Sequence, residues 1–317
     1  MKRLILFTVL ALALAFSQAL AAEEFGVYVR AAEDIGMTFD EAVSALEAAL
    51  PQAGWRVLAS YPAGVPEGCR FRAHNIVIHS DEYAAKIMAH GPLSAFALPL
   101  RVGLYQDEKG LAAAFVNPAS INRTVLGDGV EKELSAQTMD ALAGAIAGAL
   151  KVKGVKKQIG EVRTAGRVGG MGGGDFTDKV EVIHEGGDFE AVSAKVKEGI
   201  LANRDGWTLA YSLPLAGSEA VIYGVTRTST EARAFDIAGE RRESKANSCP
   251  GIDHAPAFPI EVVVLKDSGG VKAVTLDEMY RMKLYFEDAG NWAFFKNMGM
   301  PGELEEEIKR MSGWKLR

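Results

Sequence analysis

The chain has 317 residues, 48% of them hydrophobic, and carries 35 basic against 41 acidic side chains, a formal net charge of −6. This length is enough for two domains of ordinary size, each with its own hydrophobic core. The acidic balance argues against a nucleic-acid partner, because neutralising a phosphate backbone needs clustered Lys and Arg side chains.

The segment Met1–Ala21 has the three parts of a secretory signal peptide. A short basic region that includes Lys2 and Arg3 precedes an apolar run, Leu4–Phe16, and the small-x-small cleavage site Ala19-Leu20-Ala21. Cleavage before or near Ala22 removes two of the 35 basic residues and leaves 33 against 41 acidic ones, a charge of −8. Because no other stretch approaches 18 apolar residues, we expect a periplasmic or secreted protein with no transmembrane segment.

The pattern after the signal peptide predicts a strand, a helix and a second strand. Phe25–Arg30 has the composition of a strand, and Thr38 with Glu41 forms a capping box at the start of a helix. Apolar residues then recur at helical spacing until Pro51, and Trp55–Ser60 predicts the next strand. The apolar helix positions are Phe39, Val43, Leu46 and Leu50.

A further strand and helix are expected in the middle of this segment. His74–His79 predicts the strand, and Ser80 the N-cap of the helix that follows. That helix carries the apolar or small residues Tyr83, Ala84, Ile87 and Met88.

A hairpin completes the unit and begins at Pro99, which lacks an N–H donor and suits the first position of a strand. In its first strand apolar residues alternate with a second set of residues, and this period of two predicts that only the apolar face is buried. The sets are Leu100, Val102 and Leu104 against Arg101, Gly103 and Tyr105. Asp107–Gly110 predicts the turn, and Leu111–Val116 the second strand.

The segment Gly91–Ala113 returns without a gap in the second half of the chain, as Gly251–Ala273. Average residue usage gives about one or two chance identities over such a length, so this match indicates a tandem duplication. The eight identical pairs are Gly91/Gly251, Ala95/Ala255, Ala97/Ala257, Pro99/Pro259, Val102/Val262, Asp107/Asp267, Gly110/Gly270 and Ala113/Ala273.

The rest of the second copy repeats the plan of the first. Strands are expected at Val180–His184, from Gly206-Trp207 through Tyr211, and at Ala220–Thr226. The second hairpin starts at Ile260–Leu265, which is apolar almost throughout and so is expected to be more fully covered. The helix between the first two strands carries Phe189, Val192, Val196 and Ile200.

The two copies differ in the segment Ser229–Pro250, which is longer and more charged than its counterpart. Insertions of this kind lie on the surface and often acquire a specific role. Each copy ends in a helix, with stripes at Met139, Leu142, Ile146 and Leu150 and at Leu304, Ile308 and Met311. An aromatic group near the second closing helix covers the core edge or forms an apolar patch; its members are Tyr285, Phe286, Trp292, Phe294 and Phe295.

We therefore expect an α+β protein made of two tandem copies, each with a mainly antiparallel sheet covered by helices, that pack as an internal pseudo-dimer. The expected boundaries are residues 1–21 for the signal peptide and 22–160 for the first copy, 161–175 for a linker and 176–317 for the second copy. The linker contains six glycines between Gly166 and Gly174, at spacings unlike those of nucleotide-binding loops.

Each copy resembles the domain-of-unknown-function 302 (DUF302) family in its order of elements, from the helix with a Phe start to the hairpin led by Pro. A Cys-Asn-Pro motif is typical of the family before the second helix, and His79 stands at the place of its Cys in the first copy. In the second copy either Gly224–Thr226 or Ser248–Pro250 corresponds to this motif. The resemblance implies two compact α+β domains and no established activity.

Cys69 and Cys249 are the only cysteines. They are able to pair in an oxidising compartment, but they do not occupy matching positions in the two copies. The sequence thus slightly favours two unpaired thiols over a bridge.

The sequence contains no catalytic or metal-binding signature, and no cofactor is expected. His79 and Ser80 precede a predicted helix N-terminus, where a ligand can bind, although a capping role explains them as well. Cys249, Asp253 and His254 supply a thiol and a base in one loop, although three such residues in a loop more often have no joint role.

The resulting hypothesis is an exported, non-enzymatic protein that binds a small ligand or a protein partner. The alternative is an enzyme of unrecognised type that uses the loop of Cys249, Asp253 and His254.

Overall fold

The computed structural model describes residues 26–159, 175–202, 204–238, 249–286, 288–289 and 295–314. The expected signal peptide, the glycines of the expected linker, and Trp292 and Phe294 lie outside these ranges. Within the ranges, none of the helices combines the length and hydrophobicity that a transmembrane span requires.

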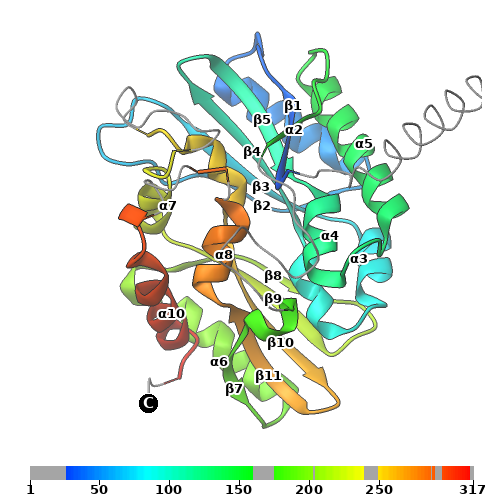
Figure 1. The fold of residues 1–317 in the computed structure, drawn as a ribbon, viewed down its shortest axis with the longest axis vertical. Coiled ribbons are helices and arrows are strands. Elements are labelled where there is room, and N and C mark those ends of the chain that lie inside the picture. Colours follow the sequence, from blue (N-terminus) through cyan, green and yellow to red (C-terminus); the bar gives the residue numbers. More distant parts are fainter. Residues whose placement is uncertain are drawn as a thin grey trace, which may run out of the picture.

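The first half, residues 26–159, forms a six-stranded antiparallel sheet with the order β2-β3-β4-β5-β1-β6 (Figure 1). Its strands are β1 (Tyr28–Ala32), β2 (Arg56–Pro62), β3 (Ala73–His79), β4 (Leu100–Asp107), β5 (Gly110–Val116) and β6 (Lys157–Ile159).

The second half, described between residues 175 and 314, forms a five-stranded antiparallel sheet with the order β8-β9-β10-β11-β7. Its strands are β7 (Val180–Glu185), β8 (Thr208–Pro214), β9 (Ala220–Thr226), β10 (Ile260–Asp267) and β11 (Gly270–Leu276). The order repeats that of the first sheet strand for strand, with no counterpart of β6 among the described residues. The predicted α+β class with two mainly antiparallel sheets is confirmed, and the two equal orders are consistent with a tandem arrangement.

Helices cover one face of each sheet. In the first half α2 lies on β2, β3 and β4 and α5 on β1, and in the second half α6 crosses β8 to β11 (Figure 1). The α-helices are α2 (Phe39–Gln52), α3 (Asp81–Met88), α4 (Pro118–Leu126), α5 (Lys132–Ala149), α6 (Phe189–Leu201), α7 (Thr228–Ala234), α8 (Glu278–Tyr285) and α10 (Met300–Met311). Four 3-10 helices complete the described part, η1 (Pro92–Ala97), η2 (Phe176–Lys179), η3 (Arg204–Gly206) and η4 (Ile252–Ala257).

The local signals in the sequence are confirmed at these helix starts and turns. Thr38 and Glu41 form the predicted capping box, with hydrogen bonds of 3.3 Å and 2.9 Å to each other's side chains. The Ser80 hydroxyl accepts from the Tyr83 amide, 3.4 Å away, and so caps α3. The turn between β4 and β5 is closed by the Asp107 carboxylate, which accepts from the amide of Lys109 at 2.8 Å.

The sequence did not predict α4, because this helix has no apolar stripe. It lies between η1 and α5, and the buried side chains of Asn122 and Thr124 on it have hydrogen-bond partners. The Asn122 amide accepts from the Tyr83 hydroxyl at 3.0 Å and donates to the Ser135 hydroxyl at 2.9 Å. A polar face that is satisfied inside the protein looks the same in the sequence as one that faces water.

The two halves interlock through their 3-10 helices. η4 of the second half lies on β3, β4 and β5 of the first sheet, and η1 of the first half lies on β9 and β10 of the second sheet. The approach is close at Gly103, where an added Cβ would lie 2.6 Å from Cδ of Pro256. A side chain larger than glycine at this position would force the halves apart.

This interlocking overturns the expectation that β4 has one buried face. Arg101 and Tyr105 belong to the set that was expected to face away from the core, yet they are only 3% and 0% exposed. The second half covers them. β10 is buried from Ile260 through Leu265, as its apolar sequence predicts.

Two charged residues meet in this covered region. Arg101 and Glu261 occupy the same position in β4 and β10, and they form an ion pair across the junction. Both are buried, and the Arg101 guanidinium also donates to the Pro259 carbonyl at 3.3 Å and lies 4.6 Å from the centre of the Tyr285 ring. One position of the repeat therefore carries opposite charges in the two halves.

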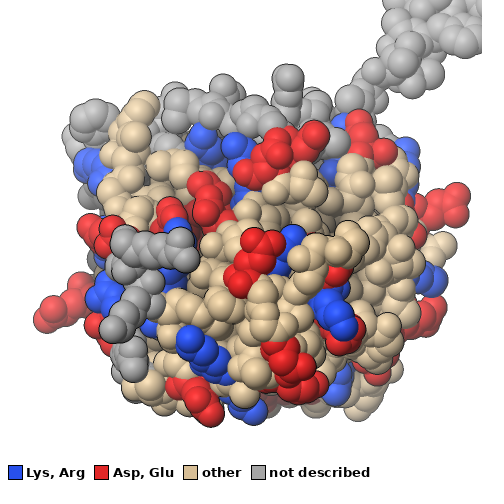
Figure 2. All heavy atoms as spheres, turned by 90° about the horizontal axis from the view of Figure 1, so that it is seen from below, with Lys and Arg blue, Asp and Glu red and all other residues tan. Residues whose placement is uncertain are grey.

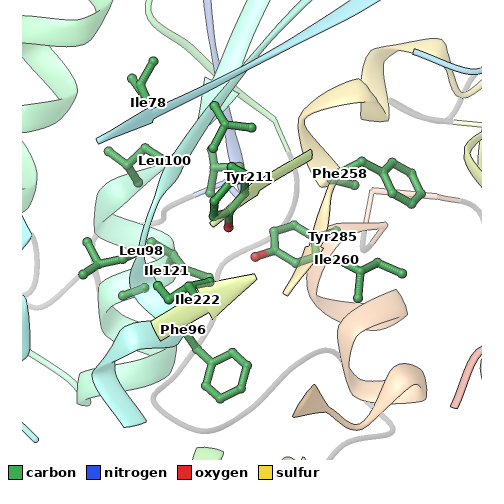
Figure 3. Close-up of a cluster of buried hydrophobic side chains, with 14 of the residues drawn as sticks. Ile78, Phe96, Leu98, Leu100, Ile121, Tyr211, Ile222, Phe258, Ile260 and Tyr285 are labelled. Carbon is green, nitrogen blue, oxygen red and sulfur yellow. The ribbon is translucent and has the colours of Figure 1, made fainter. Parts of the chain in front are cut away.

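The apolar core is continuous across the junction. A single cluster of buried side chains draws on both halves, and in Figure 3 Leu98 and Ile121 of the first half lie beside Ile222 of the second. The same view shows Tyr211 and Tyr285 with their hydroxyl groups pointing toward one another. Burial, with the nearby Glu261 charge as the second cause, raises the pKa of Tyr211 well above its usual value.

We expect Arg101→Glu and Glu261→Arg each to lower the free energy of unfolding by about 3–5 kcal/mol, because each leaves like charges buried together. The double variant restores opposite charges and should recover at least half of that loss. Urea denaturation of the four proteins measures the coupling. A double variant as unstable as the sum of the two single variants would show that the pair does not hold the junction.

Candidate functional site

β2 and β8 are the outer strands of the two sheets, and they lie against each other at the junction of the halves. Between them lies an open pocket with a volume of 360 Å³. Its walls come from β2 on one side and from β8, the end of β9 and the start of α7 on the other. The polar lining residues are Ser60, Tyr61, Thr208, Thr226, Thr228 and Glu231, and the rest of the lining is glycine or apolar.

Among the described residues Glu231 is the only carboxylate in this lining, and none of the described lining residues is basic. One carboxylate oxygen accepts from the backbone N–H of Gly64 at 2.5 Å and the other from the Thr226 hydroxyl. Gly64 belongs to the first half and packs tightly here, since an added Cβ would lie 2.5 Å from the Thr228 carbonyl oxygen. Glu231 therefore ties the loop after β2 to α7.

Burial sets the protonation of this site. Glu231 is 2% exposed, and burial raises its pKa to about 7 although the hydrogen bonds from Thr226 and Gly64 act in the opposite direction. Burial and then the Glu231 charge raise the pKa of the neighbouring Tyr61 well above its usual value. At neutral pH the pocket thus combines a phenol donor with a carboxyl group that titrates, an arrangement common at functional sites.

A serine and a histidine meet at the edge of the same pocket. The Ser60 hydroxyl lies 2.7 Å from Nε2 of His74, and burial lowers the pKa of that imidazole. This is the contact of a nucleophile with a base. In the described residues no carboxylate is hydrogen-bonded to the other ring nitrogen of His74, so the group that orients the base in serine hydrolases is absent there.

His79 and Ser80 lie at the end of β3, where the sequence predicts them. Nε2 of His79 lies 2.8 Å from the Asp81 carboxylate, and burial lowers the pKa of the imidazole despite that contact. The strand pairing sets His79 opposite Arg56 and Thr226 opposite Thr208. The strand ending at Thr226, rather than the loop around Cys249, is therefore the structural counterpart of the strand ending at His79.

Cys249, Asp253 and His254 lie in and before η4, at the other end of β3. Cys249 packs with Ala73 at the start of the strand, and six residues of strand, about 20 Å, separate Ala73 from His79. The predicted residues are therefore not gathered in one cleft. His254 and Asp253 are both buried, and Nε2 of His254 lies 2.8 Å from the Asp288 carboxylate.

The two cysteines are joined in a disulfide, with their Cα atoms 5.7 Å apart. The preference for unpaired thiols was therefore wrong. It rested on the unmatched positions of the cysteines in the repeat, but the interlocking of the halves brings the loop before β3 against η4. Cys249 is fully buried beside Phe71 and Phe235 in a small apolar cluster at the junction.

Glu231 and Tyr61 were not among the residues singled out in the sequence, and Thr226 was named only as the end of one of two possible counterparts of the family motif. The one other hint was the position of Glu231 within the divergent segment Ser229–Pro250. Their common feature is that they line the space where two sheet edges meet.

Glu231 predicts a fall in stability as pH rises. Its folded pKa of about 7 lies above the ordinary value of 4.5, so its contribution is fully present below about pH 4.5 and is lost as pH rises through 7. Between pH 5 and pH 8 we expect the wild-type protein to lose on the order of 1–3 kcal/mol of unfolding free energy through Glu231, and Glu231→Gln to remove this loss. Urea midpoints at the two pH values measure it.

Glu198→Gln on the exposed face of α6 is the matched control and should leave the pH dependence unchanged. An unaltered slope in Glu231→Gln would mean that Glu231 titrates as an ordinary exposed carboxylate.

Comparisons with known proteins find one family that is similar to part of the chain. The family model described as "Domain of unknown function DUF302" matches residues 29–149. A solved structure, that of an uncharacterised conserved DUF302 protein from Bacillus stearothermophilus, is similar at 18% identity over 40% of this chain and 96% of that chain, with a TM-score of 0.31. No curated protein matches the chain. Residues 29–149, which run from β1 to the end of α5, are therefore the part of the chain that is similar to the DUF302 family.

Proposed function

We propose that this protein is an exported, non-enzymatic binding protein that holds a small polar ligand between its halves, in the pocket of β2 and β8. The observation that carries the proposal is the 360 Å³ pocket with a single buried carboxyl group in its lining. This volume lies at the lower end of the range of ligand pockets, which suits a small molecule.

The chemistry of the lining favours a neutral or cationic ligand. Four hydroxyl groups from Ser and Thr side chains offer hydrogen bonds, and Glu231 supplies the only charge in the described lining. An anion would meet no basic side chain there and would be repelled by Glu231 when that group is ionised. Amines and polyols therefore fit better than carboxylates.

The pseudo-dimer is part of this proposal. The pocket has walls from both halves, and Gly64 of the first half bonds Glu231 of the second, so the site depends on their packing. The enzymatic alternative is less favoured, because Cys249 has no free thiol while it is bonded to Cys69.

We expect at least one of putrescine, ethanolamine and glycerol to raise the melting temperature of the mature protein, and acetate and succinate to leave it unchanged. A ligand at 100 times its Kd stabilises by about 2.7 kcal/mol, a shift of several degrees for a protein of this size. Thr208→Trp fills the pocket and should abolish the shift. Ser212→Trp is the control, since Ser212 is exposed on the same strand but does not line the pocket.

A shift that persists in Thr208→Trp would place the ligand elsewhere, and the absence of a shift with any of the three compounds would count against an amine or polyol site.

The proposed export and the disulfide can be tested in one experiment. Protein recovered from the periplasm or the medium should begin at or near Ala22 and weigh two hydrogens less than the reduced chain, because the oxidising compartment allows the bridge to persist. Intact-mass spectrometry before and after reduction measures both features. Protein that retains Met1, or whose mass rises on thiol alkylation without prior reduction, would contradict the expectation.

A further inference from the structure

The edge strands β2 and β8, and the corresponding strands β1 and β7 at the opposite sides of the two sheets, differ in what covers their outer edges. β2 and β8 lie against each other at the junction. The outer edge of β1 is paired with β6, through Tyr28 with Ile159, Val29 with Gln158 and Arg30 with Lys157. The outer edge of β7 pairs with no strand among the described residues.

β7 occupies the same place in its sheet as β1. β1 pairs with β5 through Tyr28–Val116 and Val29–Phe115, and β7 pairs with β11 through Val180–Leu276 and Glu181–Thr275. Since β5 and β11 are corresponding strands of the repeat, with Val116 matched to Leu276, the residues Val180, Glu181 and Val182 of β7 correspond to Tyr28, Val29 and Arg30 of β1. These are the three positions that β6 covers in the first half.

The two edges differ in burial as this comparison predicts. All five residues of β1 are buried, whereas β7 has no fully buried residue. Val182 is 48% exposed and is one of only five exposed large apolar side chains in the described part of the chain. An exposed edge with an apolar side chain readily accepts another strand.

We propose that the outer edge of β7 docks an extended segment of a partner protein as an added antiparallel strand, with the triad apolar, Lys or Arg, apolar opposite Val182, Glu181 and Val180. The segment takes the place that β6 takes on β1.

The basic residue at the centre of the triad follows from charge. The central residue of β6 is Gln158, whose side-chain oxygen accepts from the Asn117 amide at 3.2 Å. In the second half, the residue that corresponds to Val29, opposite Gln158, is Glu181, so Glu181 would lie opposite the central residue of an added strand. Asp277, the N-cap of α8, stands in the place of Asn117. Two basic side chains, Lys179 and Lys283, already lie near Asp277. Glu181 is therefore the carboxylate that favours a Lys or Arg side chain on the added strand.

The same charges disfavour a second copy of this chain as the occupant. Two β7 edges would bring Glu181 and Glu185 of each copy together, and like charges opposite each other destabilise a strand pair. Figure 2 shows the end of the molecule where the second sheet lies, and acidic and basic side chains are interspersed on it. Selectivity for the partner segment therefore comes from its residue directly opposite Glu181, because the surrounding surface has no predominant charge.

Three labelled peptides test the proposal on the full mature chain. One has the sequence Ser-Thr-Val-Lys-Val-Thr-Ser, the second carries Glu in place of Lys, and the third carries Pro in place of both Val residues. Fluorescence anisotropy should show the Lys peptide binding about 3–10-fold more tightly than the Glu peptide, as expected for attraction against repulsion between cross-strand pairs. The Pro peptide, which cannot donate its ladder hydrogen bonds, should not bind.

Variants of Glu181 locate the site. Glu181→Lys should reverse the preference between the Lys and Glu peptides, and the milder Glu181→Gln should remove it. Glu198→Lys on α6 makes the same change in net charge at an exposed position away from β7 and should leave the preference intact. NMR should show slowed amide exchange within 180–185 on addition of the Lys peptide.

The proposal is overturned if no peptide binds at 1 mM, a generous limit for a short strand, on the order of 4 kcal/mol of binding free energy. It is also overturned if Glu181→Lys and Glu181→Gln both keep the wild-type preference, or if the free protein is a dimer with the β7 amides already protected. None of these results bears on the pocket of β2 and β8.

Discussion

The structure depends on the buried contact between Arg101 and Glu261, which meet across the junction from the same position of the two halves. A buried ion pair contributes little net stability compared with apolar side chains, but a wrong partner is costly. A symmetric pair of identical halves would bring two arginines or two glutamates together at this place. The pair therefore specifies which surface of one half meets which surface of the other. The interlocked η1 and η4, the continuous core and the walls of the pocket follow from that choice.

Much of the fold was predictable because its signals are local. The capping box at Thr38, the cap at Ser80 and the Asp-to-Gly turns each depend on residues within four positions of one another, and the repeat located the hairpin twice. Contacts between the halves carry no such signal. The alternation in β4 correctly predicted a strand, but the face bearing Arg101 and Tyr105 looks solvent-exposed until η4 is known to cover it. The burial of that face and the disulfide are decided by partners in the other half of the chain.

The candidate site escaped prediction for the same reason. Ser60 and Tyr61 lie on an edge strand of one sheet, Thr208 lies on an edge strand of the other, and Glu231 belongs to a short helix beyond it. Each has an ordinary local role, and only the meeting of the two edges puts them around one space. The second half departs from the first at Glu231, which lies in the divergent segment Ser229–Pro250, and at the outer edge of β7, which has no counterpart of β6 among the described residues. One departure completes the pocket, and the other leaves a strand edge unpaired in the described structure.

The bridge joins Cys69 to Cys249, 180 positions further along the sequence, and the loop that it closes includes the whole connection between the halves. A protease that cuts anywhere inside this loop opens the backbone without dividing the molecule, because the two fragments remain linked through sulfur. A nicked chain would therefore remain one molecule, and its two fragments would be able to separate only after reduction of the bridge.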